Sequence, residues 1–393
     1  MALLFISNVV PDKEEYWNTA FNRSGNNVEL GIASNLPQDT ELWSCPALPS
    51  FPRGRLFYRG RKVELENGRN ISILPALNLK FIKSIFWGIL CFNRIILWRL
   101  KHWGEDCVVL TYNNDPPPFE YLLAACRITG SKLFTILYDL GVPPATLKIS
   151  RMTRLAYHYT DKVAHYVIKR LDGRIIINER IAKDYAPQNN YLLIDGGIGN
   201  NIIERLFPLK LSSNRNLVLV LAGMLWEQNG TALVLNTLKQ HPELNVKVIF
   251  AGKGQDVSDI INEAKSDSRI EYKGMLSPDE LFRVYETADV LLNLRIEDTV
   301  DYHFPSKLLE YLVTGKVVIS TPVAHAERDY GRFLSILNPA TPESLSSLLK
   351  EIMNIDKETL FRKGVEQRNY MIENRTWEVR TKEIIAYISS NKS

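Results

Sequence analysis

The chain alternates short, largely apolar runs with amphipathic stretches whose apolar residues recur every three to four positions. Apolar runs occur at 3–10, 108–112, 133–139, 217–223, 246–252, 289–294 and 317–319. Runs of this length predict strands buried on both faces, and the stretches between them predict helices that cover a sheet. Alternation of strand and helix is typical of α/β proteins with parallel sheets.

The opening residues predict a strand, a helix and a second strand. We expect the first strand over 3–10, a helix over 14–24 that ends at Gly25, and the next strand over 28–33. The loop after the first strand lacks G-x-G-x-x-G, so the dinucleotide fingerprint is missing from it. A new series of strands and helices begins at residue 217, which predicts two α/β domains in the 393-residue chain.

Composition narrows the class of protein. Hydrophobic residues make up 45% and charged residues 23%, as in ordinary globular domains. The four cysteines, Cys45, Cys91, Cys107 and Cys126, show no C-x-x-C spacing, so we expect neither a zinc site nor disulfides, and a reducing cytoplasm. The apolar start is too short for a secretory signal and predicts a core strand. No metal site is expected.

The net charge of +4 is unevenly distributed. Residues 1–200 hold 24 Lys and Arg against 18 Asp and Glu, whereas the remainder holds 24 against 26. No nucleic-acid-binding module is recognisable, so we expect no nucleic-acid partner. The basic first half suits an anionic membrane surface or a phosphate-bearing acceptor.

Two segments of the first half combine aromatic and basic residues. Residues 51–62 carry four arginines and a lysine, which indicates a contact with lipid head groups or an acceptor pyrophosphate, or else a solvated hairpin. Residues 81–103 are the most apolar, but Asn93 and Arg94 interrupt them, so we expect no membrane span. A core helix and a helix lying in the head-group region both fit this segment.

Residues 303–321 predict a helix start, a short helix, a glycine stop and a buried strand. Pro305 suits the first helical position, and Ser306 and Lys307 follow in the opening turn, where backbone N–H groups lack partners and attract anions. Glu310 lies one turn further on. The spacing suits pyrophosphate at the helix start and ribose hydroxyls on Glu310; an ordinary crossover helix with a solvated glutamate is the alternative.

This segment resembles the donor-binding signature of glycosyltransferase family 4, also called glycosyl transferases group 1. The Phe-Pro-x-Lys sequence before Glu310 is similar to a subgroup found in bacterial surface-polysaccharide clusters. Glu310 matches the family's second glutamate, which holds the ribose. Tyr302 stands at the place of the first glutamate, which acts near the sugar ring, so the resemblance passes that role to Asp301, Tyr302 or Glu297.

The resemblance is specific over residues 215–330 and implies the GT-B fold, with two Rossmann-like domains whose parallel sheets face a central cleft. It implies an acceptor-binding domain over 1–200 and a nucleotide-sugar-binding domain over 201–375. Residues 376–393 would form a helix that crosses back to the N-terminal domain, with Trp377 as the hinge aromatic. A loop between the domains would contain Gly196 and Gly197.

Further site residues follow from the resemblance. The family's Arg and Lys on the donor pyrophosphate are replaced by Met224 and Asn229, so Lys307 and Lys253 would supply the charge. Asp139, at a strand end, would polarise the acceptor hydroxyl; an aspartate that caps the following helix is the alternative. We therefore expect catalytic roles for Asp139, Asp301 and Tyr302, and donor-binding roles for Gly223, Lys253, Met275, Leu276, Pro305, Ser306, Lys307, Leu308 and Glu310.

The implied activity is transfer of a sugar, with retention of configuration, from a UDP- or GDP-linked donor to a glycan or lipid-linked saccharide in bacterial polysaccharide biosynthesis. No metal or other cofactor is expected. The expected location is the cytoplasm or the inner face of the plasma membrane, with peripheral contact through the basic N-terminal domain. A sugar-nucleotide epimerase and a catalytically silent partner subunit remain alternatives, and the missing cations and first glutamate favour the latter.

Overall fold

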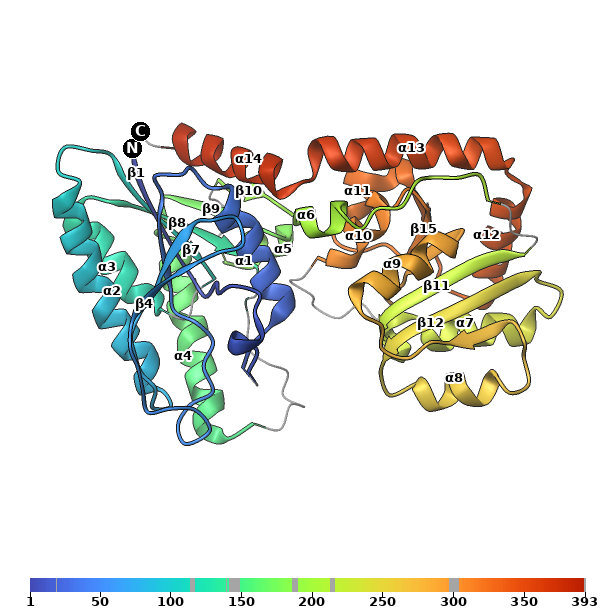
Figure 1. The fold of residues 1–393 in the computed structure, drawn as a ribbon, viewed down its shortest axis with the longest axis horizontal. Coiled ribbons are helices and arrows are strands. Elements are labelled where there is room, and N and C mark those ends of the chain that lie inside the picture. Colours follow the sequence, from blue (N-terminus) through green and yellow to red (C-terminus); the bar gives the residue numbers. More distant parts are fainter. Residues whose placement is uncertain are drawn as a thin grey trace. The chain divides into compact units, whose positions relative to one another are not determined.

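The structure is a computed structural model that describes residues 1–18, 20–113, 117–138, 140, 149–185, 190–212, 216–296 and 304–391. The chain divides into two compact units (Figure 1). Unit 1 comprises Met1–Gly197 with Trp377–Ser393, and unit 2 comprises Ile198–Thr376. Each unit is built on its own sheet.

Unit 1 contains an eight-stranded sheet. Its strands, in spatial order, are β10 (Leu192–Leu193), β9 (Gly173–Ile176), β8 (Lys132–Leu137), β7 (Cys107–Tyr112), β1 (Ala2–Ser7), β2 (Glu41–Ser44), β5 (Asn70–Ile73) and β4 (Arg61–Glu64). Neighbours are parallel except β4 and β5, which are antiparallel. β3 (Phe57–Tyr58) and β6 (Ala76–Leu77) form a separate antiparallel ribbon.

The helices of unit 1 pack on both sides of this sheet. They are η1 (Glu14–Tyr16), α1 (Arg23–Asn35), α2 (Ile82–Lys101), α3 (Phe119–Thr129), α4 (Arg151–Ile168), α5 (Glu179–Tyr185) and α14 (Trp377–Ser390). α2 contacts α3, and α3 contacts α4, while α1 contacts α14 from the other end of the chain (Figure 1).

The predicted strand over 28–33 is wrong, because these residues belong to α1. The Asn22 side chain accepts a hydrogen bond from the Gly25 N–H and caps the helix, so Gly25 lies in its first turn and does not end an earlier helix. Buried Asn26, Leu30 and Ala33 recur at helical spacing. The second strand of the sheet is β2, eight residues further on.

Unit 2 contains a six-stranded, wholly parallel sheet. Its strands, in spatial order, are β13 (Ile270–Tyr272), β12 (Val246–Lys253), β11 (Leu217–Met224), β14 (Val290–Asn293), β15 (Val317–Ser320) and β16 (Leu334–Ile336). The helices are α6 (Asn200–Ile203), η2 (Glu227–Asn229), α7 (Thr231–Gln240), α8 (Val257–Glu263), α9 (Pro278–Thr287), α10 (Ser306–Val313), α11 (Ala326–Tyr330), η3 (Gly331–Phe333), α12 (Pro342–Asn354) and α13 (Lys357–Asn374).

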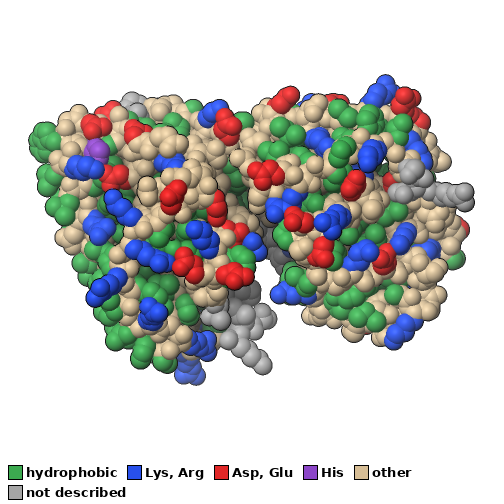
Figure 2. Space-filling model, in the orientation of Figure 1, with side chains coloured by type: hydrophobic (Ala, Val, Ile, Leu, Met, Phe, Trp, Pro, Cys, Tyr) green, Lys and Arg blue, Asp and Glu red, His purple; other side chains and the backbone are tan. Residues whose placement is uncertain are grey.

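Both units are therefore Rossmann-like α/β domains, as the alternation of strands and helices predicts. Their sheets are buried: β1 and β7 are covered along their whole lengths, and Phe250 and Leu292 lie in the core of unit 2. On the visible face of unit 1, Lys and Arg side chains lie among hydrophobic ones (Figure 2). Within the described ranges, every helix is too short or too polar to cross a bilayer.

Candidate functional site

The sheet of unit 2 has a topological switch point between β11 and β14. From β11 the chain proceeds outward through β12 to β13, then returns to the other side of β11 and continues from β14 through β15 to β16. Connections on the two sides of such a point diverge and leave a crevice at the carboxyl ends of the strands, where α/β proteins bind ligands.

A pocket of about 190 Å³ lies at this point. It is lined by residues from the ends of β11 and β14, the loops that follow them and the start of α10: Leu221, Ala222, Met224, Asn229, Leu292, Asn293, Leu294, Arg295, Pro305, Ser306, Lys307 and Tyr311. Three predicted site residues, Pro305, Ser306 and Lys307, thus line one pocket. Their positive and polar groups suit an anion.

Gly223 lies next to the Lys307 side chain at this pocket. Its φ of +122° favours glycine, and a Cβ atom added there would lie 3.1 Å from Cε of Lys307. Gly252, on β12, is the residue paired with Gly223 in the sheet. Its φ is +139°, and an added Cβ would lie 1.9 Å from the Gly223 carbonyl oxygen. The two glycines therefore let both strand ends and the lysine stem lie close together.

The start of α10 presents backbone N–H groups near the pocket. Pro305 is the N-cap residue and Ser306 the first helical residue, one position later than expected, and no side chain caps the end at Pro305. The Leu308 N–H donates to the Pro305 carbonyl at 2.8 Å. The Leu308 side chain is buried in the core, so it supports the helix from below.

Glu310 lies beside a pair of buried tyrosines. The Tyr285 hydroxyl, on α9, donates to Oε1 of Glu310 at 2.9 Å. Tyr285 packs edge-on against Tyr311, whose hydroxyl donates to the Ala222 carbonyl at 3.4 Å. Burial, with the nearby Tyr311 and Glu310, raises the pKa of Tyr285 well above its ordinary value, so the hydroxyl stays a donor that orients the carboxylate.

The remaining predicted donor-binding residues lie at the ends of β12 and β13. Lys253 ends β12 in register with Met224 and is exposed. Gly274, with a φ of +70°, follows β13, and its carbonyl accepts the Gly252 N–H at 2.7 Å. Met275 is 66% exposed and Leu276 is half-buried.

One cation at the pocket was missed by sequence reasoning. Met224 and Asn229, at positions where the resemblance expects cations, line the pocket, and the Asn229 amide donates to the Met224 carbonyl at 2.7 Å. Arg295 also lines it, and its backbone N–H donates to the Thr321 hydroxyl at 2.8 Å. Its place just after β14, at a strand tip beside β11, is the signal that could have identified it.

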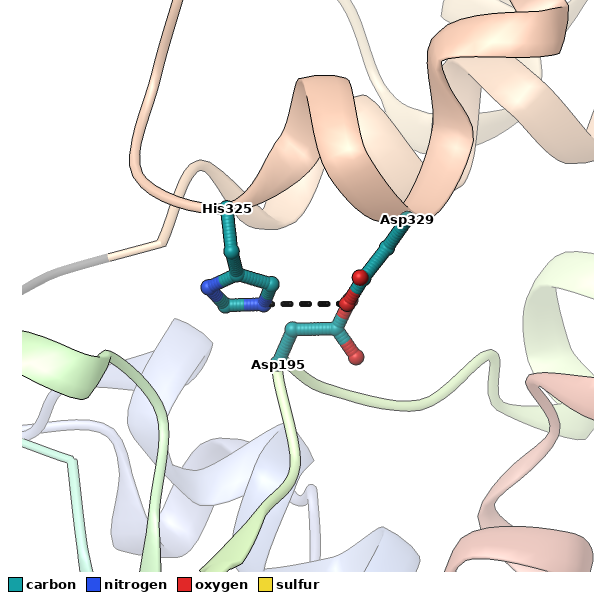
Figure 3. Close-up of side chains that lie close together, drawn as sticks. All are labelled: Asp195, His325 and Asp329. Carbon is teal, nitrogen blue, oxygen red and sulfur yellow. Dashed lines mark ion pairs between the residues drawn. The ribbon is translucent and has the colours of Figure 1, made fainter.

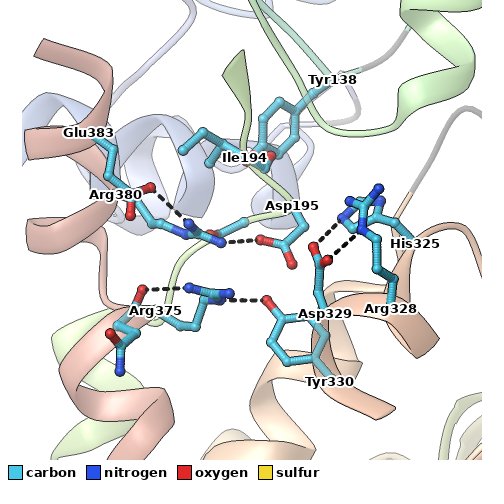
Figure 4. Close-up of polar contacts among 12 residues, drawn as sticks. Tyr138, Ile194, Asp195, His325, Arg328, Asp329, Tyr330, Arg375, Arg380 and Glu383 are labelled. Atoms are coloured by element: carbon cyan, nitrogen blue, oxygen red, sulfur yellow. Dashed lines mark hydrogen bonds and ion pairs between the residues drawn. The ribbon is translucent and has the colours of Figure 1, made fainter. Parts of the chain in front are cut away.

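An aromatic cluster holds the chain just before α10. Phe304 is buried and stacks on His325 with ring centroids 5.0 Å apart. Nε2 of His325 lies 3.8 Å from Oδ2 of Asp329, one turn further along α11 (Figure 3). Tyr330 flanks Phe304 at 6.4 Å and accepts a hydrogen bond from Nε of Arg375 at 2.8 Å (Figure 4). These contacts position Pro305 and the helix start.

The predicted interdomain loop is held by the C-terminal helix of unit 1. A Cβ on Gly197 would lie 2.4 Å from the Trp377 ring, and Nε of Arg380 donates to the Gly196 carbonyl at 3.3 Å. The Arg380 guanidinium also pairs with buried Asp195 at 2.6 Å and with Glu383 at 2.8 Å (Figure 4). The loop is therefore rigidly packed on α14.

The predicted catalytic residues Asp139, Asp301 and Tyr302 lie outside the described residues, as does Glu297. Their roles remain predictions. Two described residues flank them. Tyr138 is buried just after β8, and Phe304 is buried just before α10.

Residues 216–354 match the family model described as glycosyl transferases group 1. A search of curated proteins gave no significant match. Among solved structures, HepE from Anabaena in complex with UDP is similar with a TM-score of 0.65 and 13% identity, covering 99% of this chain and 100% of that one. The catalytic domain of starch synthase IV from Arabidopsis thaliana gives 0.63 and 10%, covering 100% and 99%.

Sucrose-phosphate synthase from Thermosynechococcus elongatus is similar over 99% of both chains, with a TM-score of 0.62 and 13% identity. The fold is GT-B. This confirms the predicted class of two Rossmann-like domains with parallel sheets. The match of the family model to unit 2, taken with this fold, supports a glycosyltransferase.

Proposed function

We propose that the protein is a retaining glycosyltransferase that uses a UDP- or GDP-linked sugar bound by unit 2. The acceptor would be a glycan or lipid-linked saccharide bound by unit 1, in the synthesis of a bacterial polysaccharide. The observation that carries the proposal is the pocket at the switch point, where Lys307, Arg295 and the start of α10 converge. Two of the similar structures, HepE and the starch synthase IV catalytic domain, contain bound UDP and bound ADP respectively, which supports a nucleotide ligand.

In this proposal the diphosphate lies at the start of α10. Backbone N–H groups of the first turn donate to its oxygens, and Lys307 and Arg295 balance its charge. The same groups would stabilise the diphosphate as it leaves, because negative charge grows there when the sugar bond breaks. Protein cations can do this without a metal ion, so we propose metal-independent transfer.

The nucleoside would extend from the diphosphate across the carboxyl edge of the sheet. Glu310 would accept hydrogen bonds from the ribose hydroxyls through its second oxygen, while Tyr285 holds the first. The base would lie near Met275, over the glycine-rich ends of β12 and β13. Together these assignments place the diphosphate, the ribose and the base of one extended ligand.

A catalytically silent subunit is the second candidate. It is favoured by Met224 and Asn229, which occupy the places of two family cations. Arg295 and Lys307 argue against it, since they restore two positive charges to the same pocket. Binding of a nucleotide without turnover of any sugar would favour the silent subunit.

We also propose that unit 1 lies against the inner face of the plasma membrane through α2. One face of α2 is in the core, with Trp87, Cys91 and Trp98 buried, as a core helix requires. The opposite face exposes Ile82, Ile85, Ile89, Leu97 and Leu100, and Trp103 beyond the helix end is 80% exposed. Arg94, Arg99 and Lys101 lie on the same helix, and this combination suits an anionic head-group region.

The decisive experiment is calorimetric titration with UDP and GDP. We expect one of them to bind the full-length protein, and Lys307→Met to weaken binding about tenfold through loss of one charge-assisted contact. Lys265→Met is the matched control, because Lys265 lies beyond α8 and bonds Asn262 at 3.0 Å. Failure of both nucleotides to bind at millimolar concentration would refute the proposed donor site.

A further inference from the structure

Unit 1 contains a cavity of about 660 Å³, separate from the proposed donor site and lined in part by the basic segment 51–62. Its floor is apolar and lies at the carboxyl ends of three neighbouring parallel strands, β1, β2 and β5. Val10 follows β1, Leu48 follows β2, and Leu74 follows β5. Strand tips of a parallel sheet are the usual ligand edge, and the volume suits a small ligand.

The rim of this cavity is basic. Arg55, Arg59 and Arg61 line it together with a single carboxylate, Glu15, so the lining has a net charge of +2. Arg61 is already engaged: it donates to the Tyr16 hydroxyl at 2.9 Å and lies 3.7 Å from Glu15. Within the described part of the chain, Arg55 and Arg59 form no ion pair, so they remain available to an anion.

The segment that carries these arginines is tightly held. Buried Asn78 donates through its amide to the Pro49 and Arg55 carbonyls, each at 2.9 Å. A Cβ on Gly54 would lie 2.3 Å from the Pro49 carbonyl oxygen, and one on Gly60 would lie 2.9 Å from the Pro75 ring. The backbone of 49–60 therefore has little freedom, which lowers the entropy cost of binding.

Aromatic rings supply the walls between the floor and the rim. Tyr16, Phe21, Phe57 and Tyr58 all line the cavity. The Tyr58 hydroxyl accepts the Arg55 N–H at 3.1 Å, which orients its ring, and Phe57 is 52% exposed. Flat apolar faces beside hydroxyl and guanidinium groups suit a sugar ring, whose C–H face is apolar and whose edge is polar.

We propose that this cavity binds a saccharide that carries a phosphate group. The phosphate would lie between Arg55 and Arg59, because the guanidinium fork matches phosphate oxygens in pairs. The sugar ring would lie against Phe57 and Tyr58 over the apolar floor. The inference rests on the proposed function in one respect: it identifies the ligand with the acceptor of the transfer.

Two kinds of molecule present this chemistry, a free sugar phosphate and a saccharide joined through phosphate to a lipid. The first experiment uses glucose 1-phosphate as the probe and follows tyrosine and arginine signals of the full-length protein by NMR. We expect saturable binding, at least tenfold tighter than that of glucose or of inorganic phosphate alone. Equal affinity for glucose and glucose 1-phosphate would overturn the proposal.

Matched charge changes locate the site. Arg55→Gln with Arg59→Gln is expected to weaken glucose 1-phosphate binding by roughly tenfold or more, the usual effect of losing charge-assisted contacts. Arg53→Gln with Lys62→Gln removes the same charge from the same exposed segment but from outside the cavity lining, and should leave affinity within about twofold. Equal losses in both pairs would mean general attraction to a basic surface and would overturn the site.

A third arm compares glucose 1-phosphate with glucosyl phosphate esterified to a decyl chain. Tighter binding of the ester identifies a lipid-linked ligand, and tighter binding of glucose 1-phosphate identifies a free one. Titration of the unsubstituted protein with both UDP and glucose 1-phosphate keeps the two proposals separate. UDP binding with no sugar phosphate bound at tens of millimolar refutes this cavity's role alone, whereas bound sugar phosphate without UDP binding refutes the donor site alone.

Discussion

Lys307 reaches the candidate donor pocket past Gly223. A Cβ added at residue 223 would lie 3.1 Å from Cε of Lys307, which is tighter than an ordinary contact. The sequence predicted donor-binding roles for both residues, from a helix-start pattern at Lys307 and from the family resemblance at Gly223, and those roles remain predictions. It missed Arg295, because the neighbour of that residue in space, β11, lies some seventy residues earlier in the chain.

Gly223→Ala should reduce both stability and nucleotide affinity. A Cβ at a φ of +122° costs about 1–3 kcal/mol in backbone strain, and at 3.1 Å from Cε it would shift the Lys307 side chain by a few tenths of an ångström. Chemical unfolding and UDP titration would measure the two effects. Gly104→Ala is the control, since its φ is +86° with nothing within 4 Å. Unchanged UDP affinity in Gly223→Ala would contradict the assigned position of Lys307.

Glu310→Ala should weaken nucleotide binding by roughly tenfold to a hundredfold, as expected for lost hydrogen bonds to a charged group. Because Glu310 is half-buried on the surface of α10, the fold should remain intact by circular dichroism. Tyr285→Phe removes the bond that orients the carboxylate and should cause a smaller loss. If a deoxyribose nucleotide loses as much affinity in the variant as UDP does, the ribose assignment fails.

At the scale of elements, α10 and α1 show when the spacing of apolar residues is sufficient to predict a helix and when it is not. The buried face of α10, Leu308, Leu309 and Leu312, and the stop at Gly315 were predicted and confirmed. In α1 the apolar residues at 30, 32 and 33 satisfy both a strand and a helix pattern. Tertiary contacts decide the outcome there, since buried Glu29 accepts the Asn8 N–H at 2.6 Å after β1.

The exposed face of α2 should mediate binding to anionic vesicles. Ile89→Glu with Leu97→Glu places two carboxylates on residues that are 51% and 65% exposed, so it should abolish flotation with phosphatidylglycerol vesicles without unfolding unit 1. Leu211→Glu with Ile261→Glu makes the same change on exposed residues of unit 2 and should have no effect. Equal flotation of both variants would refute the membrane role of α2.

At the scale of the whole molecule, the two-sheet architecture was predictable because central strands such as β1 and β7 are buried on both faces and are therefore almost continuously apolar. The candidate site was predictable in part. Glycines and helix starts leave local signals, whereas a cavity such as the one lined by Arg55 and Arg59 arises from three strands and a hairpin that meet only in the folded chain.

Transfer should proceed with retention and without a divalent metal. An NMR time course with a competent nucleotide sugar and acceptor should show the donor's anomeric configuration in the first-formed product. Activity should be unchanged by millimolar EDTA, because protein cations and helix N–H groups would stabilise the leaving diphosphate. Inversion of configuration, or loss of activity restored by Mg²⁺, would contradict this mechanism.

The return of α14 to unit 1 has a consequence for the order in which the chain matures. Trp377 fills the space beside Gly31 and Gly197, Arg380 neutralises buried Asp195, and Tyr387 donates to the Asn190 carbonyl at 3.2 Å. A ribosome delivers these residues only after the whole of unit 2. Unit 1, most of which is synthesised before unit 2, is therefore completed after it, and nascent chains should carry a finished unit 2 beside an open, chaperone-accessible unit 1.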